Sequence, residues 1–260
     1  MKNYIVTTGR KAKIDSEILA LKVAEKLNLK FVRRENFSTD ALKKIYGVEN
    51  ILTAKKNSLS LLTEAGELFF HPNTAHLRIK NLRQGLGDRL IDAAEIQQGM
   101  KILDCTLGLG SDAIVESFVV GESGKVIALE INPVLAEIVR HGMKNFSADN
   151  EVILNAMRRI EVVTADYLEY LKSAADKSFD AVYFDPMFRH PINKSSGINA
   201  IRPVADNRPL TLQAVQEACR VAKKCVVMKE NSRSQEFERL GFKIAEGGKY
   251  SSISFGLIKI

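Results

Sequence analysis

The chain has 260 residues, of which 45% are hydrophobic and 27% are charged, with 38 Lys and Arg against 31 Asp and Glu. This balance is typical of a globular protein with a sizeable core, and it excludes disordered, collagen-like and coiled-coil chains. No apolar run reaches the ~18 residues of a membrane span, and no secretion signal opens the chain. Three widely spaced cysteines, Cys105, Cys219 and Cys225, argue against a disulfide framework. We therefore expect a cytoplasmic protein that does not enter membranes.

The net charge of +7 is concentrated near the N-terminus. Residues 1–60 hold 13 Lys and Arg against 6 Asp and Glu, whereas residues 61–260 hold 25 of each kind. A basic segment joined to a neutral one suggests that the first part meets a polyanion such as RNA. A solvated, lysine-rich surface is the equally simple alternative.

The first 72 residues are expected to form a small basic α/β domain, a candidate for RNA binding. Apolar spacing predicts a helix over residues 14–27, and Ser38 can cap a second helix that Gly47 ends. Pro72 marks the expected boundary, and residues 73–99 follow as two connecting helices. Short apolar runs predict the strands of this domain at residues 4–6, 30–32, 51–52, 59–62 and 67–70.

From residue 100 to residue 260, strands and helices alternate. This order predicts a mostly parallel, Rossmann-like sheet between layers of helices, with a C-terminal antiparallel hairpin. Strands are expected at residues 101–105, 126–129, 160–163, 180–184 and 225–228, helices at 112–120, 133–145 and 210–222, and the hairpin at 242–244 and 252–258.

A glycine turn connects the first of these strands to its helix. Gly108 and Gly110, followed by Ala113, match the dinucleotide fingerprint, in which glycines allow a tight turn and close ligand approach. Glu130 follows Gly110 by 20 residues, at the end of the next strand, where an acid can hold ribose hydroxyls. A purely structural turn is the alternative interpretation.

Two cofactors fit this pattern, a nicotinamide dinucleotide and S-adenosylmethionine (SAM). Asp104 lies at the end of the strand before the glycines, where a carboxylate can bind the ammonium group of an amino acid, and this favours SAM. Asp166 follows the third strand, where it can face the adenine amino group. A helix N-cap is the alternative role of Asp166.

The fourth strand ends in Asp185-Pro186-Met187-Phe188, the most discriminating segment of the chain. An exocyclic amine on a base is a poor nucleophile because its lone pair is delocalised into the ring. The Asp185 carboxylate and the Pro186 carbonyl can accept its two N–H bonds, and Phe188 offers a face for an unstacked base. We therefore assign catalysis to Asp185, Pro186 and Phe188. Turn formation by Asp-Pro and burial of Phe188 are the alternative.

Residues 187–209 lack periodicity and are predicted to form a substrate-binding loop beside the site. Basic side chains in this loop would contact phosphates. The substrate-binding residues are expected to be Met187, Arg189, Lys194, Arg202 and Arg208.

In three stretches the chain resembles the class I SAM-dependent methyltransferases, and more closely the ribosomal RNA small subunit methyltransferase J family. These stretches are residues 103–113, residues 129–134 and Asp185-Pro186-Met187-Phe188. The resemblance implies the class I sheet, SAM as cofactor, and methylation of guanine N2 in small-subunit ribosomal RNA. It covers roughly residues 73–260, while the first 70 residues match the family poorly. The chain departs from the family pattern at Ser111, Ile131 and Arg189.

Together, the glycine turn and the resemblance predict the cofactor contacts. No spacing of cysteine and histidine suits a metal. Cys105 is interpreted as a packing residue, and Lys229, at the end of the fifth strand, as a snorkelling surface lysine. The predicted SAM-binding residues are Asp104, Thr106, Gly108, Gly110, Ser111, Asp112, Glu130, Ile131, Asp166, Tyr167 and Asp185.

The sequence thus predicts a SAM-dependent RNA methyltransferase acting on an exocyclic amine, with ribosomal RNA or a small ribosomal subunit particle as partner. Three alternatives remain open. They are an NAD(P)-dependent oxidoreductase, a catalytically silent RNA-binding protein, and a methyltransferase for a small molecule or protein.

Overall fold

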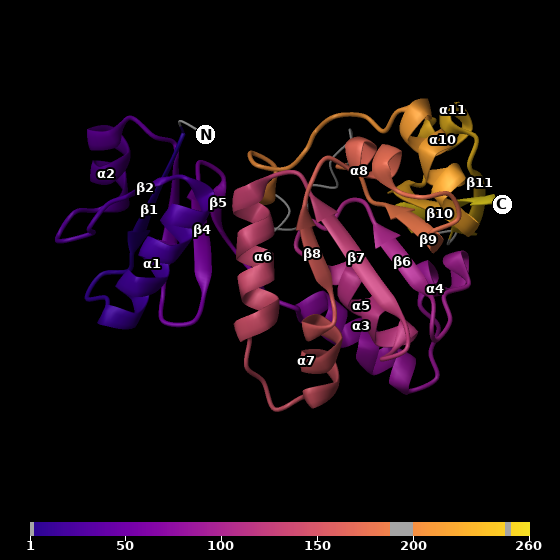
Figure 1. Ribbon diagram of the computed structural model, residues 1–260, viewed down its shortest axis with the longest axis horizontal. Helices are drawn as coiled ribbons and strands as arrows, with labels where there is room; N and C mark the ends of the chain where they lie inside the picture. The colour runs from indigo at the N-terminus through magenta and orange to yellow at the C-terminus, as the bar shows by residue number, and fades with distance from the viewer. Residues whose placement is uncertain (1–2, 188–199, 248–250) are drawn as a thin grey trace. The chain divides into compact units, whose positions relative to one another are not determined.

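A computed structural model describes residues 3–187, 200–247 and 251–260. The chain forms two compact units (Figure 1). The N-terminal unit comprises Met1–His71, Pro133–Ser147 and Asn193–Ala205, and the second unit comprises Pro72–Asn132, Ala148–Ile192 and Asp206–Ile260.

The N-terminal unit is built on a five-stranded sheet with the order β2-β1-β3-β4-β5. Strand β1 pairs in parallel with β2 and β3, whereas β3, β4 and β5 form an antiparallel meander. Its strands are β1 (Tyr4–Thr8), β2 (Lys30–Phe31), β3 (Asn50–Ala54), β4 (Leu59–Thr63) and β5 (Gly66–Phe69). Its helices are α1 (Ile14–Leu27), α2 (Thr39–Tyr46) and α6 (Pro133–Asn145).

The predicted ends of α2 are confirmed. The Ser38 hydroxyl accepts a hydrogen bond from the Ala41 amide, and Gly47 ends the helix in the left-handed conformation at φ 62°. A small core lies beneath this helix, made by Ile5, Val32, Leu42, Val48 and Ile51.

The second unit is built on a seven-stranded sheet with the order β11-β12-β10-β9-β6-β7-β8. Strands β6 to β10 run parallel, and β12 and β11 add the antiparallel C-terminal hairpin, as predicted. The strands are β6 (Lys101–Asp104), β7 (Lys125–Glu130), β8 (Glu161–Thr164), β9 (Phe179–Phe184), β10 (Ala222–Asn231), β11 (Lys243–Gly247) and β12 (Ile253–Lys259).

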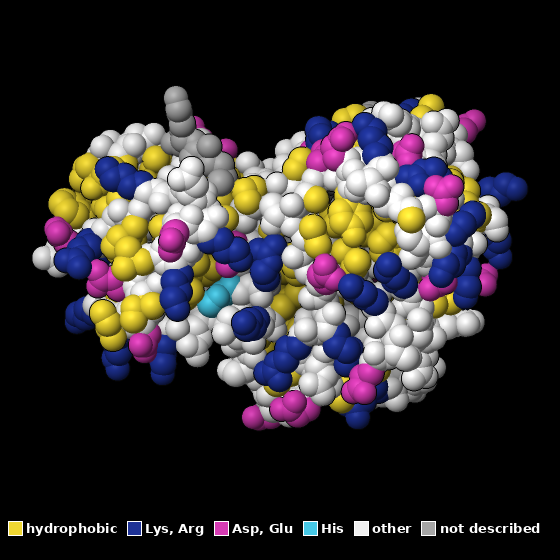
Figure 2. Space-filling view, viewed as in Figure 1, with side chains coloured by type: hydrophobic (Ala, Val, Ile, Leu, Met, Phe, Trp, Pro, Cys, Tyr) yellow, Lys and Arg dark blue, Asp and Glu magenta, His cyan; other side chains and the backbone are white. Residues whose placement is uncertain are grey.

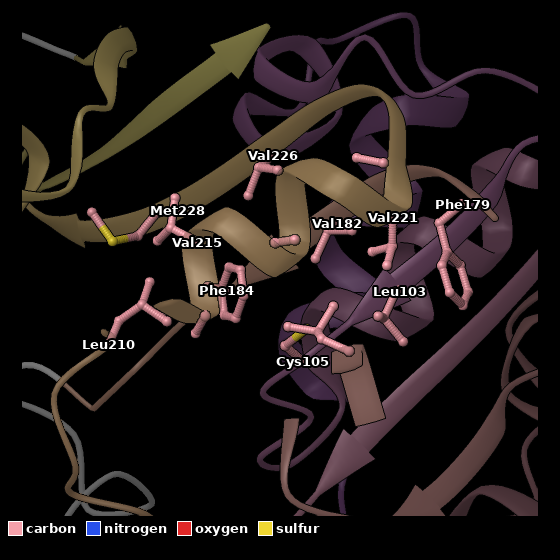
Figure 3. Packing of buried hydrophobic residues seen from close by; sticks show 14 of the residues in the cluster. Leu103, Cys105, Phe179, Val182, Phe184, Leu210, Val215, Val221, Val226 and Met228 are labelled. Atoms are coloured by element: carbon pink, nitrogen blue, oxygen red, sulfur yellow. The ribbon is translucent and has the colours of Figure 1, made fainter. Parts of the chain in front are cut away.

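Helices cover both faces of this sheet. Helix α5 contacts β6, β7 and its neighbours α3 and α7, whereas α10 contacts β9, β10 and α8. Because successive side chains of a strand point to opposite faces, Val182 and Phe184 pack beneath α10 while Tyr183 faces α5. Figure 3 shows the core on the α10 side. The helices are α3 (Asn73–Arg83), α4 (Arg89–Ala94), α5 (Ser111–Val120), α7 (Glu151–Arg158), α8 (Tyr167–Ser173), α10 (Leu212–Val221) and α11 (Glu236–Leu240).

Two of these helices, α7 and α11, were not predicted, and α8 was anticipated only through the alternative role of Asp166 as an N-cap. The helices α7, α8 and α11 are only eight, seven and five residues long. Helices of about two turns or fewer show little periodicity in the sequence, and they depend on tertiary packing. Helix α8 buries a single residue, Leu171, against the sheet.

Candidate active site

The candidate site lies where the strand order of the seven-stranded sheet reverses. Strand β6 pairs with β7 on one side and with β9 on the other, so the connections leaving β6 and β9 diverge at their carboxyl ends. Open α/β sheets bind ligands in the crevice at this switch point. Asp104 ends β6 and Asp185 follows β9, which brings two predicted site residues to the same place.

The predicted glycine turn connects β6 to α5. Gly108 and Gly110 have φ of 52° and 80°, the left-handed region that glycine adopts without strain. Gly110 is the N-cap of α5 and offers no side chain to the first amides of that helix. These amides are therefore left for a ligand or solvent.

Asp104 and Thr106 connect the glycine turn to the end of β9. The buried Asp104 Oδ1 accepts a hydrogen bond of 2.8 Å from the Thr106 amide, and the Thr106 hydroxyl accepts one of 2.6 Å from the Asp185 amide. Burial raises the pKa of Asp104 to about 8, and the neighbouring carboxylates of Asp112 and Asp185 add to the effect. A cationic ligand group beside Asp104 would favour its ionised form.

Glu130, at the end of β7, is also buried and lies against the glycine turn. Its Oε1 accepts a hydrogen bond of 2.9 Å from the Asn132 amide, and the Gly108 amide donates to the same carboxylate. Burial nevertheless raises the pKa of Glu130 to about 7. The carboxylate is thus placed to accept hydrogen bonds from ribose hydroxyls, as predicted for this residue.

Lys229 is a partly buried member of the site, with a side chain only 19% exposed, so its interpretation as a surface lysine was wrong. Its Nζ lies 2.7 Å from Asp185 Oδ2 and 3.0 Å from Asp112 Oδ2. The two carboxylates raise the pKa of Lys229 and hold it charged despite its partial burial. A lysine that extended to solvent from this position would give up its ion pairs with both carboxylates.

Arg78 and Tyr183 complete this ion-pair network, and sequence reasoning gave neither a role. Arg78 on α3 donates to both oxygens of Asp88 and also pairs with Asp112. The Tyr183 hydroxyl donates to Asp112 Oδ2 at 3.0 Å. Lys229 and Arg78 hold the pKa of Asp112 well below its ordinary value, so the carboxylate that was predicted to contact SAM is neutralised by protein cations.

Strand alternation was the signal that would have identified Lys229. Val227 of β10 pairs with Tyr183 of β9, so two residues further along each strand Lys229 lies beside Asp185. The two side chains share a face of the sheet because two residues is the period of a strand. The order of the motifs along the sequence does not by itself reveal which residues of β9 and β10 lie side by side.

Asp166 is the N-cap of α8, the alternative that the sequence left open for it. Its Oδ1 accepts hydrogen bonds from the amides of Leu168 and Glu169, and its Oδ2 pairs with Arg208 at 2.7 Å. Arg208 also pairs with Asp206. The Tyr167 ring packs edge-on against Phe184, with the Arg208 guanidinium 5.9 Å from the ring centre.

The remaining predicted residues lie at several places. Ser111 begins α5, Ile131 is 37% exposed beyond β7, and Pro186 and Met187 follow Asp185 partly buried. Arg202 belongs to the N-terminal unit. Cys105 is buried with a raised pKa, as a packing residue should be. Phe188, Arg189 and Lys194 lie outside the described residues.

The residues at the switch point fit SAM. Asp104 offers an anion for the ammonium group, Glu130 offers acceptors for the ribose, and the glycine turn leaves backbone amides near both. The buried Ser111 hydroxyl, at the start of α5, has no hydrogen-bond partner among the described residues. A polar ligand at the turn would supply one.

Two further observations, on metal ligands and on membrane-spanning helices, concern residues 3–187, 200–247 and 251–260 only. No group of three or more Asp, Glu, His or Cys side chains there is arranged to hold a metal ion. No helix among the same residues is long and apolar enough to cross a membrane.

Comparisons with known proteins agree with this geometry. The family model described as "Putative SAM-dependent methyltransferase" matches residues 39–249. The protein YpiP of Bacillus subtilis is 37% identical over 98% of this chain and 99% of its own length. A solved SAM-dependent methyltransferase from Neisseria gonorrhoeae superposes with a TM-score of 0.65 at 17% identity, covering 98% of this chain and 95% of its own, which shows a shared fold.

More limited similarity extends to ribosomal RNA small subunit methyltransferase J. The protein of that name from Shewanella amazonensis is 32% identical over 55% of this chain and 56% of its own length. The Vibrio campbellii protein is 38% identical over 42% of this chain and 44% of its own length. The chain therefore spans about half the length of these relatives. The family match decides between the two cofactors that the glycine turn allowed. The chain belongs to the SAM-dependent methyltransferase family, and we refer to its second unit as the catalytic unit from here on.

Proposed function

We propose that this methyltransferase modifies an exocyclic amine of a base in RNA, namely guanine N2 in small-subunit ribosomal RNA. The observation that carries the proposal is the position of Asp185-Pro186 beside Asp104 at the switch point of the sheet. An acceptor pair for an amine thus stands next to the predicted binding residues for the methyl donor.

The chemistry requires positioning more than acid or base strength. SAM would supply a methyl group bound to a sulfonium sulfur. Transfer breaks the bond between this sulfur and the methyl carbon, and S-adenosylhomocysteine is the leaving group. The Asp185 carboxylate and the Pro186 carbonyl accept the two N–H bonds of the amine and direct its lone pair toward that methyl group. When the N–C bond forms, the amine loses one proton, for which the Asp185 carboxylate is the nearest acceptor in this arrangement. Orientation of this kind contributes several kcal/mol, roughly 7–11 at best.

Two observations support RNA as the substrate. Relatives with similarity to about half of this chain carry the name of a ribosomal RNA methyltransferase. The basic residues of segment 1–60 belong to the N-terminal unit. Figure 2 shows Lys and Arg side chains on the visible face of this unit. We propose that the predicted domain 1–72 binds RNA phosphates, while the catalytic unit receives the base.

The experiment that tests this function compares ribosomal RNA from a deletion strain and its parent. Nuclease digestion and mass spectrometry should show one methylguanosine missing from small-subunit RNA of the deletion strain. A plasmid carrying the wild-type gene should restore it, and one carrying Asp185→Ala should not. An unchanged RNA profile would contradict ribosomal RNA as substrate and would favour a small molecule or a protein.

A further inference from the structure

We propose that Lys229 is a positioning residue for methyl transfer, which fixes one oxygen of Asp185 and leaves the other to receive the substrate amine. The inference deepens the proposed function and rests on it for the role of Asp185. It assigns a task to a lysine outside the motifs that define the site.

The contacts define which oxygen is held. Lys229 Nζ donates to Asp185 Oδ2 at 2.7 Å, and the same ammonium donates to Asp112 Oδ2 at 3.0 Å. The Asp185 amide is held separately by the Thr106 hydroxyl at 2.6 Å. With its backbone and one carboxylate oxygen fixed, Asp185 presents Oδ1 as the acceptor for an N–H bond.

The ammonium is itself held from the other side. Asp112, its second partner, pairs with Arg78 and accepts a hydrogen bond from the Tyr183 hydroxyl. Arg78 is in turn fixed by two hydrogen bonds to Asp88, of 2.7 and 2.8 Å. This series of contacts, from Asp88 through Arg78 and Asp112 to Lys229, therefore fixes the lysine to the helices α3, α4 and α5.

Lys229 opposes the effects that disfavour ionisation of Asp185. Burial disfavours ionisation of Asp185, and the like charge of Asp112 on α5 adds to this effect, so the pKa of Asp185 lies above its ordinary value. Asp104 on β6 is a third carboxyl group of this cluster, and its own pKa is raised by the charge of Asp185. The cations on the opposing side are Lys229 on β10 and Arg78 on α3, and the Tyr183 hydroxyl on β9 is neutral. Within the part of the chain that the structure describes, Lys229 is the residue that forms an ion pair with Asp185.

This arrangement suits an acceptor that must stay ionised in a crowded acidic site. A protonated Asp185 would offer a donor where the substrate amine also offers donors, and the two would repel. Lys229 favours the charged form through an ion pair at 2.7 Å, while its fixed position prevents the carboxylate from rotating away from the amine.

The first test is independent of any substrate. Carboxyl ¹³C resonances of labelled aspartate are titrated in the wild type and in Lys229→Met, with Asp185→Asn used to assign the signal. The Asp185 pKa should rise by about 1 or more in Lys229→Met and should return toward the wild-type value in Lys229→Arg. An Asp185 pKa equal in all three proteins would overturn the inference.

The second test measures transfer. In Lys229→Met, kcat should fall by about 100-fold with little change in the SAM dissociation constant, and the acidic limb of the pH–rate profile should move to higher pH. Lys229→Arg should recover part of kcat and most of the pH shift. Lys223→Met is the matched control, because Lys223 lies on the same strand and pairs with Asp180 away from the site.

The two hypotheses fail in different ways. A wild-type protein that binds SAM but methylates no RNA would contradict the proposed function, and the carboxyl titration would still decide whether Lys229 controls Asp185. A wild type that methylates RNA, with Lys229→Met equal to it in kcat and pH profile, would overturn the role of Lys229 alone.

Discussion

Asp185, which directly follows β9, is held at its amide and at its carboxylate before any substrate arrives. Its amide donates a hydrogen bond to the Thr106 hydroxyl, and its carboxylate accepts one from Lys229 of β10. Such preorganisation matters because methyl transfer from a sulfonium gains most from alignment.

Replacing Asp185 by Asn should therefore abolish transfer while leaving SAM bound. The amide keeps one acceptor but adds a donor that opposes the substrate amine, so kcat should fall by a factor of about 100 or more. Calorimetry should give a SAM affinity within a few-fold of the wild type. A variant with near wild-type kcat would remove the catalytic role of Asp185.

If Glu130 binds the cofactor ribose, cofactor binding should depend on pH. Its pKa of about 7 in the free protein means that the carboxylate is protonated at lower pH. Ribose hydroxyls donate to the ionised form, so SAM affinity should weaken as the pH falls below about 7. Glu130→Gln should bind SAM roughly tenfold more weakly at pH 8 and should lose this part of the pH dependence. A variant that retains both affinity and pH dependence would contradict the assignment.

Glu116 gives a stability prediction at the same scale. It is fully buried on α5, and neither carboxylate oxygen has a hydrogen-bond partner among the described residues. Burial, with the nearby Asp104 and Asp112, raises its pKa well above 4.5, so the folded state favours the protonated form. Its contribution to stability is thus present at low pH and is lost as the pH rises toward the folded-state pKa.

Glu116→Gln should remove this loss because the amide does not ionise. Relative to the wild type, the variant should gain stability between pH 5 and pH 8, by up to about 1.4 kcal/mol for each pH unit between the two pKa values. Thermal denaturation at both pH values measures the difference. A difference that does not change with pH would show that Glu116 is not buried in its neutral form.

Several site residues could be predicted from sequence because their position follows from a motif. Asp104 and Glu130 each end a strand near a glycine turn, and local order is enough to place them. Lys229 and Arg78 could not be placed in this way, because their partners are distant in the chain and are met only through strand register and helix packing.

At the scale of elements, strands and long helices were predicted well, and short helices only in part, since α2 and α4 were expected whereas α7 and α11 were not. Apolar alternation and glycine or proline boundaries mark β6, β7 and β9 without reference to the rest of the chain. Helix α8 depends on its Asp166 cap and on one buried leucine, features that the sequence shares with ordinary turns.

The C-terminal hairpin contains a position where only glycine fits. A Cβ added at Gly256 would lie 2.5 Å from Phe237 Cδ1 and 2.8 Å from Phe242 Cβ. Gly256→Ala should therefore destabilise the protein by about 1–3 kcal/mol in urea denaturation. Gly9→Ala is the control, since nothing lies within 4 Å of its added Cβ, and it should change stability by less than about 0.5 kcal/mol. Equal effects of the two substitutions would contradict the packing described here.

At the scale of the whole molecule, the charge of the chain is divided between segments. The excess of +7 belongs to residues 1–60, which form part of the N-terminal unit, and the rest of the chain is neutral. Composition reveals this asymmetry, but it does not reveal that the compact N-terminal unit also includes Pro133–Ser147 and Asn193–Ala205. Such long-range grouping depends on tertiary contacts that no local pattern contains.

If the N-terminal unit binds RNA, removing its exposed lysines should weaken binding at every sequence. A triple alanine variant of Lys11, Lys13 and Lys22 should have a lower RNA affinity. The slope of log K against log salt concentration should become shallower by about 2–3, because fewer phosphate contacts release fewer counterions on binding. The matched control replaces Lys177, Lys224 and Lys243, exposed lysines of the catalytic unit. Equal salt slopes for the two triple variants would argue against RNA binding by the N-terminal unit.

The most direct measurement is methyl transfer by the purified protein. Radiolabelled SAM is incubated with ribosomal RNA, and with small subunits, isolated from the deletion strain, and the modified nucleoside is identified after digestion. We expect wild-type protein to place label on the N2 amine of a guanosine in small-subunit RNA, and Asp185→Asn to place none. Absence of label from RNA with the wild-type protein, or equal labelling with both proteins, would contradict the account.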